Sequence, residues 1–218
     1  MFKAIAFDLD GVITDTANYH YLAWKALGDD LGIPFDRQFN EQLKGISRMA
    51  SLEKILELGK RTADFSNEQK LALAAKKNTH YLTLIKTISP ADILPGISSL
   101  LNELKEANIQ MVIASASKNA PTILAGLGIQ DYFDAIIDPD SLTSGKPDPE
   151  IFSQSAQVLG LTPNELIGIE DSEAGIQSIN AANMFSVGVG EATSMKLADS
   201  RVDSTAELTL DFLKQVFI

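Results

Sequence analysis

Cysteine is absent from the 218 residues of this sequence, which also holds only two histidines and one tryptophan. Without cysteine, the protein forms no disulfide and uses no thiolate as a nucleophile or metal ligand. The absence fits a reducing compartment, and we expect the protein to be cytoplasmic. Disulfide-stapled scaffolds and thiol enzymes are therefore excluded.

Basic residues are scarce: 18 lysines and arginines stand against 29 acids, a formal net charge of −11. A nucleic-acid backbone requires a basic footprint, so we expect no nucleic-acid partner. An acidic protein does not attract anionic metabolites as a whole. Any phosphate-bearing substrate must then be held by a few local cations.

Long hydrophobic runs are also missing, because no apolar stretch approaches the roughly 18 residues that span a bilayer. The first residues lead into a short strand that ends in acids, which is not the layout of a signal peptide. We expect no membrane partner. A hydrophobic content of 45% and a charged content of 22% are ordinary for a globular chain.

The most informative stretch is the first one, where an apolar run ends in Asp8-Leu9-Asp10-Gly11-Val12. The run predicts a buried parallel strand, and open α/β sheets place their chemistry at the carboxyl ends of such strands. Asp8 and Asp10 point the same way from an extended backbone, and their charges repel unless a cation or a proton is shared. The pattern indicates a metal-assisted active site. A polar turn after a strand is the alternative.

The rest of the chain divides into a helical stretch and an alternating one. Residues 17–87 show helical apolar spacing and no convincing strand, and Ser66 with Gln69 resembles a capping box. After the linker 89–96, strands and helices alternate, which predicts βαβ units. We expect an α/β fold: a Rossmann-like core of residues 1–16 and 88–218, with a parallel sheet flanked by helices, and an inserted all-helical domain of residues 17–87.

Two more predicted strand ends carry groups suited to phosphate. Ser115 opens a hydroxyl-rich turn before a helix, where exposed backbone N–H groups form an anion cradle; a plain helix N-cap is the alternative. Lys146 lies between Gly145 and Pro147, and this restricted turn suits a charge held near a phosphate. The alternative is a solvated turn lysine. The Lys146-Pro147 bond is left open between cis and trans.

Glu170 and Asp171 follow another apolar strand and precede a helix. An acid here and Asp8 are able to share one hard cation such as Mg²⁺. Alternatively, the pair only favours the helix N-terminus electrostatically. Because four strand ends carry complementary groups, we interpret the set as catalytic.

In chain order, these four stretches resemble the four motifs of the haloacid dehalogenase superfamily, and the helical insertion resembles that of its helical-cap subgroup. The resemblance covers nearly the whole chain and extends to the sugar-phosphate mutases of the superfamily. The stretches that carry this further resemblance are His20, Trp24, 43–48, 89–92 and 115–119.

The resemblance implies that Asp8 is the nucleophile, forming an aspartyl phosphate, and that Asp10 is the general acid and base. It implies a Mg²⁺ ion held by Asp8, the Asp10 backbone carbonyl and Asp171, with Glu170 at or just beyond the first ligands. The groups that would hold the transferring phosphoryl oxygens are Ser115, the Ala116 amide and Lys146.

The resemblance also implies a site for the sugar and its second, distal phosphate, and hinges near residues 14–17 and 87–92. Trp24 belongs either to this site or to the helical core. Lys77 is expected on a solvated helix face, with a position facing the cleft as the alternative, and His80 is expected to be structural or exposed. The site residues implied are Thr16, His20, Trp24, Lys44, Gly45, Ser47, Arg48, Ser51, Ser117, Lys118 and Asn119.

The implied reaction is the interconversion of β-D-glucose 1-phosphate and β-D-glucose 6-phosphate. It would use Mg²⁺ and pass through β-glucose 1,6-bisphosphate, which also activates the enzyme. We expect a small phosphosugar substrate and a monomer. The alternatives are a sugar-phosphate or phosphoglycolate phosphatase of the same superfamily and, more remotely, a non-catalytic phosphosugar-binding module.

Overall fold

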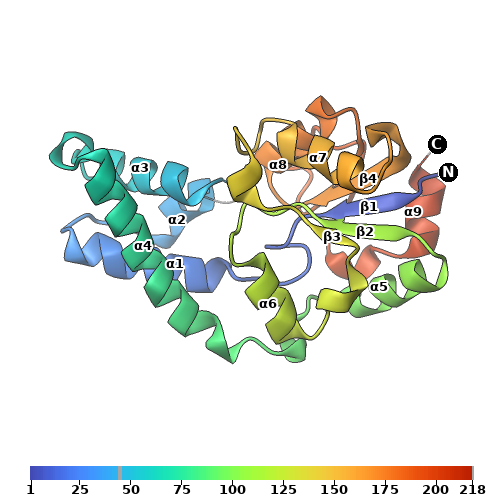
Figure 1. Cartoon of the computed structure of the whole chain (residues 1–218), viewed down its shortest axis with the longest axis horizontal. Helices are drawn as coiled ribbons and strands as arrows, with labels where there is room; N and C mark the ends of the chain where they lie inside the picture. The colour runs from blue at the N-terminus through green and yellow to red at the C-terminus, as the bar shows by residue number, and fades with distance from the viewer. Residues whose placement is uncertain (44–45, 218) are drawn as a thin grey trace. The chain divides into compact units, whose positions relative to one another are not determined.

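The computed structural model of the chain describes residues 1–43 and 46–217. It divides into two compact units, Met1–Asp15 with Ile88–Ile218, and Thr16–Thr87 (Figure 1). The predicted boundary fell one residue later, so Thr16 alone is assigned differently. Among the described residues, helices lack the combined length and apolarity that a membrane crossing requires.

The first unit is built on a six-stranded sheet in the order β3-β2-β1-β4-β5-β6, in which all neighbours pair in parallel. The central strands β1 and β4 are buried along their whole length, as the apolar sequences that lead up to Asp8 and Glu170 predict. The strands are β1 (Ala4–Phe7), β2 (Gln110–Ile113), β3 (Ala135–Ile136), β4 (Leu166–Glu170), β5 (Phe185–Val189) and β6 (Ser200–Val202).

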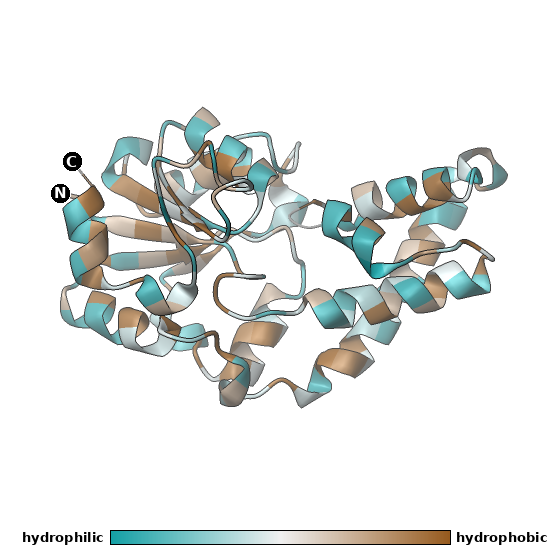
Figure 2. Cartoon of the chain, turned by 180° about the vertical axis from the view of Figure 1, so that it is seen from behind, coloured by the Kyte–Doolittle hydropathy of each residue, from teal (hydrophilic) through white to brown (hydrophobic). Residues whose placement is uncertain are grey.

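Helices cover both faces of this sheet, so the predicted α/β class is confirmed. Helices α5 (Ile97–Glu106), α6 (Ala120–Leu127) and α9 (Leu210–Val216) lie on one face, and α7 (Glu150–Val158) and α8 (Glu173–Ala181) on the other (Figure 1). The strands are mostly apolar, whereas the helices alternate between apolar and polar residues (Figure 2). This pattern places one core layer on each side of the sheet.

All the regular secondary structure described in the second unit is helical. Its helices are α1 (Ala17–Asp30), α2 (Arg37–Asn40), α3 (Arg48–Leu58) and α4 (Asn67–Leu84), with short 3₁₀ turns between them. The predicted capping box is confirmed, because Ser66 and Gln69 exchange side-chain to backbone hydrogen bonds at the start of α4. The interior is an apolar cluster that includes Trp24, Leu27, Phe35, Leu52, Ile55 and Leu56.

Strand β6 was not predicted from the sequence. Its three residues, Ser200 to Val202, show no apolar run, and Arg201 is exposed at the edge of the sheet. The nearby Asp199 carboxylate accepts a hydrogen bond of 2.9 Å from the backbone N–H of Ser186 on β5. Tertiary pairing, which local patterns do not report, therefore forms this edge strand.

Candidate active site

Asp8 lies directly beyond β1, at the carboxyl end of the central strands. Its backbone N–H donates to the carbonyl of Ile169 at 2.9 Å, so the pairing with β4 continues one residue past the strand. The side chain is buried. A carboxylate is thus fixed where neighbouring parallel strands end, which is the expected place for chemistry in such sheets.

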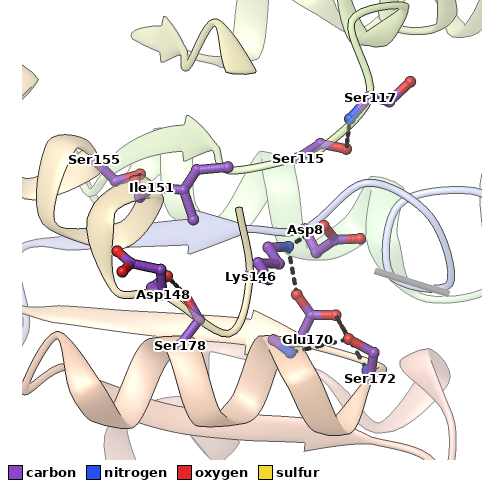
Figure 3. Close-up of polar contacts among 11 residues, drawn as sticks. Asp8, Ser115, Ser117, Lys146, Asp148, Ile151, Ser155, Glu170, Ser172 and Ser178 are labelled. Carbon is purple, nitrogen blue, oxygen red and sulfur yellow. Dashed lines mark hydrogen bonds and ion pairs between the residues drawn. The ribbon is translucent and has the colours of Figure 1, made fainter. Parts of the chain in front are cut away.

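Lys146 reaches Asp8 from a loop far along the chain. Its Nζ lies 2.5 Å from Asp8 Oδ1 and 2.6 Å from Glu170 Oε2 (Figure 3). The side chain is only 1% exposed, so the alternative of a solvated turn lysine is wrong. Burial alone would lower the pKa of Lys146, but the two carboxylates raise it above its ordinary value. The ammonium therefore stays charged. The Lys146-Pro147 peptide bond is cis.

Glu170 is fully buried, and both of its carboxylate oxygens accept hydrogen bonds from the protein. Oε2 accepts from Lys146, and Oε1 accepts from the Ser172 hydroxyl at 2.7 Å and the Ser172 backbone N–H at 3.1 Å. The sequence did not single out Ser172, although it also caps α8 by accepting from the Gly175 N–H. A Cβ at Gly175 would fall 2.0 Å from Glu170 Cδ, so a glycine leaves the room that this carboxylate occupies.

The acids at these strand ends fit a magnesium ion. Oxygen atoms of Asp8, Glu170 and Asp171 lie within 4.8 Å of one another, and hard oxygen donors are what Mg²⁺ prefers. Gly11 has a φ of +84°, and a Cβ there would fall 2.1 Å from Asp171 Oδ2, so glycine both adopts the turn and makes room for the carboxylate.

The charge balance of the site also favours a cation. Burial raises the pKa of Asp8 to about 7; the nearby charges of Glu170 and Asp10 act in the same direction, and Lys146 opposes them. One ammonium thus stands against several acids, and a divalent cation would relieve their repulsion.

Ser115 begins the turn that follows β2. The backbone N–H of Ala114 donates to the carbonyl of Phe7 at 2.7 Å, so Ser115 follows a residue paired beside the end of β1. Its Oγ accepts from the Ser117 N–H at 3.2 Å. Ser115 does not cap α6: the N-cap residue is Asn119, which makes no side-chain capping bond. Figure 3 shows Ser115 at the same strand ends as Asp8 and Lys146.

Lys118, next along this turn, is half-exposed and forms an ion pair with Asp140. Asp140 belongs to a 3₁₀ turn, η6 (Pro139–Ser141), that follows β3. The sequence did not indicate this pair, because the two residues lie in different connections of the sheet.

In the helical unit, His20 on α1 contacts Lys77 on α4, with Nδ1 and Nζ 2.8 Å apart. Lys77 is 2% exposed, so its predicted solvated position is wrong. Its ammonium lies 4.7 Å from the centroid of the Trp24 ring and 4.6 Å from that of Tyr81, where cation–π attraction stabilises the buried charge. Trp24 is buried in the apolar cluster, which favours the alternative that it fills the helical core.

Burial and the neighbouring charges keep the His20 ring neutral. Burial of the ring, followed by the positive charges of Lys77 and Arg48, lowers the pKa of His20 well below its ordinary value of 6.5. Arg48 begins α3, whose N-cap Ser47 accepts from the Ala50 N–H at 3.2 Å. The helical unit therefore gathers cationic groups near His20, whereas His80 is exposed on α4.

The remaining predicted residues fall in several places. Thr16 is fully buried just before α1, and the Ser51 hydroxyl donates to the carbonyl of Ser47 at 3.1 Å within α3. Lys44 and Gly45 lie outside the described residues. In the first unit, the structure therefore brings Lys146 and Ser115 to the same strand ends as the acids Asp8, Glu170 and Asp171. In the helical unit it places Arg48 and Lys77 near His20.

Comparison with known proteins shows the family of the chain. The family model for haloacid dehalogenase-like hydrolases matches residues 2–183, and the chain belongs to this family. Within it, the chain stands with the β-phosphoglucomutases. It is 51% identical to the β-phosphoglucomutase of Bacillus subtilis, over 98% of this chain and 94% of that one.

A solved structure of a β-phosphoglucomutase from Clostridium difficile matches with a TM-score of 0.98 at 52% identity, covering 100% of this chain and 97% of the other. A phosphatase of the family matches at lower identity. The fructose-1-phosphate phosphatase YqaB of Escherichia coli is 30% identical over 86% of this chain and 96% of its own length. The chain is accordingly an enzyme of the isomerase type in a family whose phosphomutases depend on Mg²⁺.

Proposed function

We propose that the chain interconverts β-D-glucose 1-phosphate and β-D-glucose 6-phosphate through an aspartyl-phosphate enzyme and β-glucose 1,6-bisphosphate. The observation that carries the proposal is the 51% identity to a β-phosphoglucomutase along almost the whole length of both chains. The buried Asp8–Lys146 pair supplies the chemistry that this reaction needs.

Asp8 is assigned as the nucleophile. One of its oxygens attacks phosphorus of the bisphosphate, the O–P bond to Asp8 forms, and the P–O bond to the sugar breaks. Asp10 gives its proton to the departing sugar oxygen and, in the reverse transfer, removes a proton from the attacking sugar hydroxyl. Two displacements at phosphorus, one forming and one breaking the bond to Asp8, thus change which of the C1 and C6 oxygens of the sugar carries the phosphoryl group.

The transferring phosphoryl oxygens are assigned to Ser115, the Ala116 amide and Lys146, whose charge is held by two carboxylates. Asp8, the Asp10 carbonyl and Asp171 would hold Mg²⁺, which supplies further positive charge to those oxygens. Both oxygens of Glu170 are taken by Lys146 and Ser172, so we assign Glu170 to orienting Lys146 from just outside the metal's first ligands.

The helical unit is assigned as a cap, with hinges near residues 14–17 and 87–92. The positive charges of Arg48 and Lys77 beside the neutral His20 ring support a role in binding an anionic substrate. The distal phosphate is assigned to Arg48, Ser117, Lys118 and Asn119, and the sugar to Thr16, His20, Lys44, Gly45, Ser47 and Ser51, while Trp24 is assigned to the helical core. We also propose that the protein is cytoplasmic, which the absence of cysteine supports. We propose further that it is a monomer, and sedimentation as a 23.6 kDa species would test this.

A paired assay tests the proposal against the phosphatase alternative. Purified protein receives β-glucose 1-phosphate, Mg²⁺ and a trace of the bisphosphate, and glucose 6-phosphate and free phosphate are measured together. We expect the isomer to form with little phosphate release. Stoichiometric phosphate with little isomer would establish a phosphatase instead, and no turnover with retained sugar-phosphate binding would favour the binding module.

A further inference from the structure

The connection after β3 places an acid against a cation of the proposed distal-phosphate site. Lys118 and Asp140 form an ion pair, with side chains 47% and 60% exposed. In the structure the lysine therefore already has an anionic partner. A phosphate that binds Lys118 must compete with this carboxylate.

Hydrogen bonds within its own turn hold Asp140 in place. The Asp140 N–H donates to Asp138 Oδ1 at 2.9 Å, and the Ser141 hydroxyl donates to the Asp138 carbonyl at 2.7 Å. The same hydroxyl lies 3.3 Å from Gln154 Oε1 on α7. The backbone that presents the Asp140 carboxylate is thus anchored to a core helix.

The connection that holds Asp140 continues to the catalytic lysine. The N–H groups of Thr143 and Ser144 donate to Glu150 Oε2 at 2.8 and 2.9 Å, and Lys146 then reaches Asp8. A single tied segment, residues 138–150, therefore carries the partner of Lys118 at one end and the partner of Asp8 further along.

We propose that Asp140 is a positioning residue that competes with the distal phosphate for Lys118 and thereby weakens the hold on phosphosugars. This inference rests on the proposed function, which assigns Lys118 to the distal phosphate. A phosphate dianion carries more charge than a carboxylate and displaces it. Because exposed ion pairs are weak, the competition changes affinity by a factor of about two to five.

The competition has a use in a two-step phosphoryl transfer. Differences in affinity between related complexes lie mostly in the dissociation rate, so a weaker hold shortens the residence of the bisphosphate. The bisphosphate must be released from Lys118 before its other phosphate is presented to Asp8. Asp140 therefore favours this exchange at the expense of binding.

The test compares Asp140→Asn with wild type in steady-state kinetics. We expect the half-saturating concentrations of β-glucose 1-phosphate and of the bisphosphate to fall about two- to five-fold at low salt, without a rise in kcat, and the difference to shrink at high salt. Glu106→Gln, which removes a charge from an exposed site on α5, is the matched control and should leave these concentrations unchanged. Equal melting temperatures exclude a general effect on folding.

A double-mutant cycle with Lys118→Met isolates the pair. Asp140→Asn should change half-saturation in the wild-type background and have no effect once Lys118 is removed. Unchanged or raised half-saturation in Asp140→Asn, or the same effect without Lys118, overturns the inference. These outcomes are separate from failure of the proposed function: a phosphatase would release phosphate in wild type, and the same cycle on its KM would still decide the role of Asp140.

Discussion

Asp8 is buried and forms an ion pair with Lys146. Substitution of Asp8 should affect turnover and substrate binding differently. In Asp8→Asn the side chain keeps its shape but loses the attacking oxygen, so we expect turnover to fall by at least about 10³-fold while phosphosugar binding survives. Steady-state rates and calorimetric binding measure the two quantities. Glu106→Gln is the charge control, and an Asp8→Asn variant with unchanged turnover would refute the covalent route.

The same carboxyl group makes the metal-free protein sensitive to pH. Its pKa is about 7 in the folded protein against 3.8 for the free side chain, so between these values the folded state binds more protons than the unfolded state. This contribution to stability is present below about pH 4 and is lost as the pH rises through about 7. In the presence of a chelator, the melting temperature of Asp8→Asn should therefore exceed that of wild type by more at pH 8 than at pH 5.

Added Mg²⁺ should stabilise wild type at pH 8 and affect Asp8→Asn less, because the ion binds the ionised carboxylate. A difference between the two proteins that is equal at both pH values would contradict the raised pKa. Thermal denaturation monitored by circular dichroism gives the melting temperature of both proteins in each of these conditions.

The pKa of the His20 imidazole allows a second test by titration. Lys77→Met removes the positive charge in contact with the ring, so we expect the depressed pKa of His20 to rise toward 6.5. An NMR titration of the His20 imidazole signals measures this shift. Lys76→Met, an exposed neighbour paired with Asp30, is the matched control. An unchanged His20 titration would remove Lys77 as a cause.

At the scale of elements, the first turn of α8 (Glu173–Ala181) contains Gly175, a glycine that the site requires. Replacing a glycine in a helix interior with alanine normally stabilises the helix, but a Cβ at Gly175 would collide with Glu170. We expect Gly175→Ala to lower the free energy of unfolding by about 1–3 kcal/mol and to weaken catalysis by displacing the partner of Lys146. Gly126→Ala on α6, whose nearest neighbour would lie at 3.3 Å, is the control. Urea denaturation compares them, and a stabilised Gly175→Ala would contradict the crowding.

Strand ends were predictable because unbroken apolar runs such as those ending at Asp8 and Glu170 mark buried parallel strands. The turn chemistry of α4 was equally local, and its capping box was confirmed. Strand β6 was missed because its pairing is tertiary. Lys77 was placed wrongly for the same reason: its partner His20 lies 57 residues away, and helical spacing does not reveal which polar residue a neighbouring helix will cover.

The pairs that refine the site are also distant in sequence. Lys146 and Asp8 are separated by 138 residues, and only their common position at strand ends suggested proximity. Local pattern gave no sign that Asp140 pairs with Lys118, since both lie in connections whose geometry depends on the whole sheet. Composition and motif thus indicate which groups gather, whereas the fold decides which of them touch.

At the scale of the whole molecule, the central strand β1 is separated in sequence from both strands that pair with it by about a hundred residues or more. Strand β1 pairs with β2, whose first residue is Gln110, and with β4, whose first residue is Leu166, while residues 16–87 form a separate unit. During synthesis, β1 leaves the ribosome long before either neighbour, and pairing across such separations is slow. The helical unit can form its own contacts meanwhile, whereas the catalytic end of β1 gains its paired neighbours only after β2 and β4 have been synthesised.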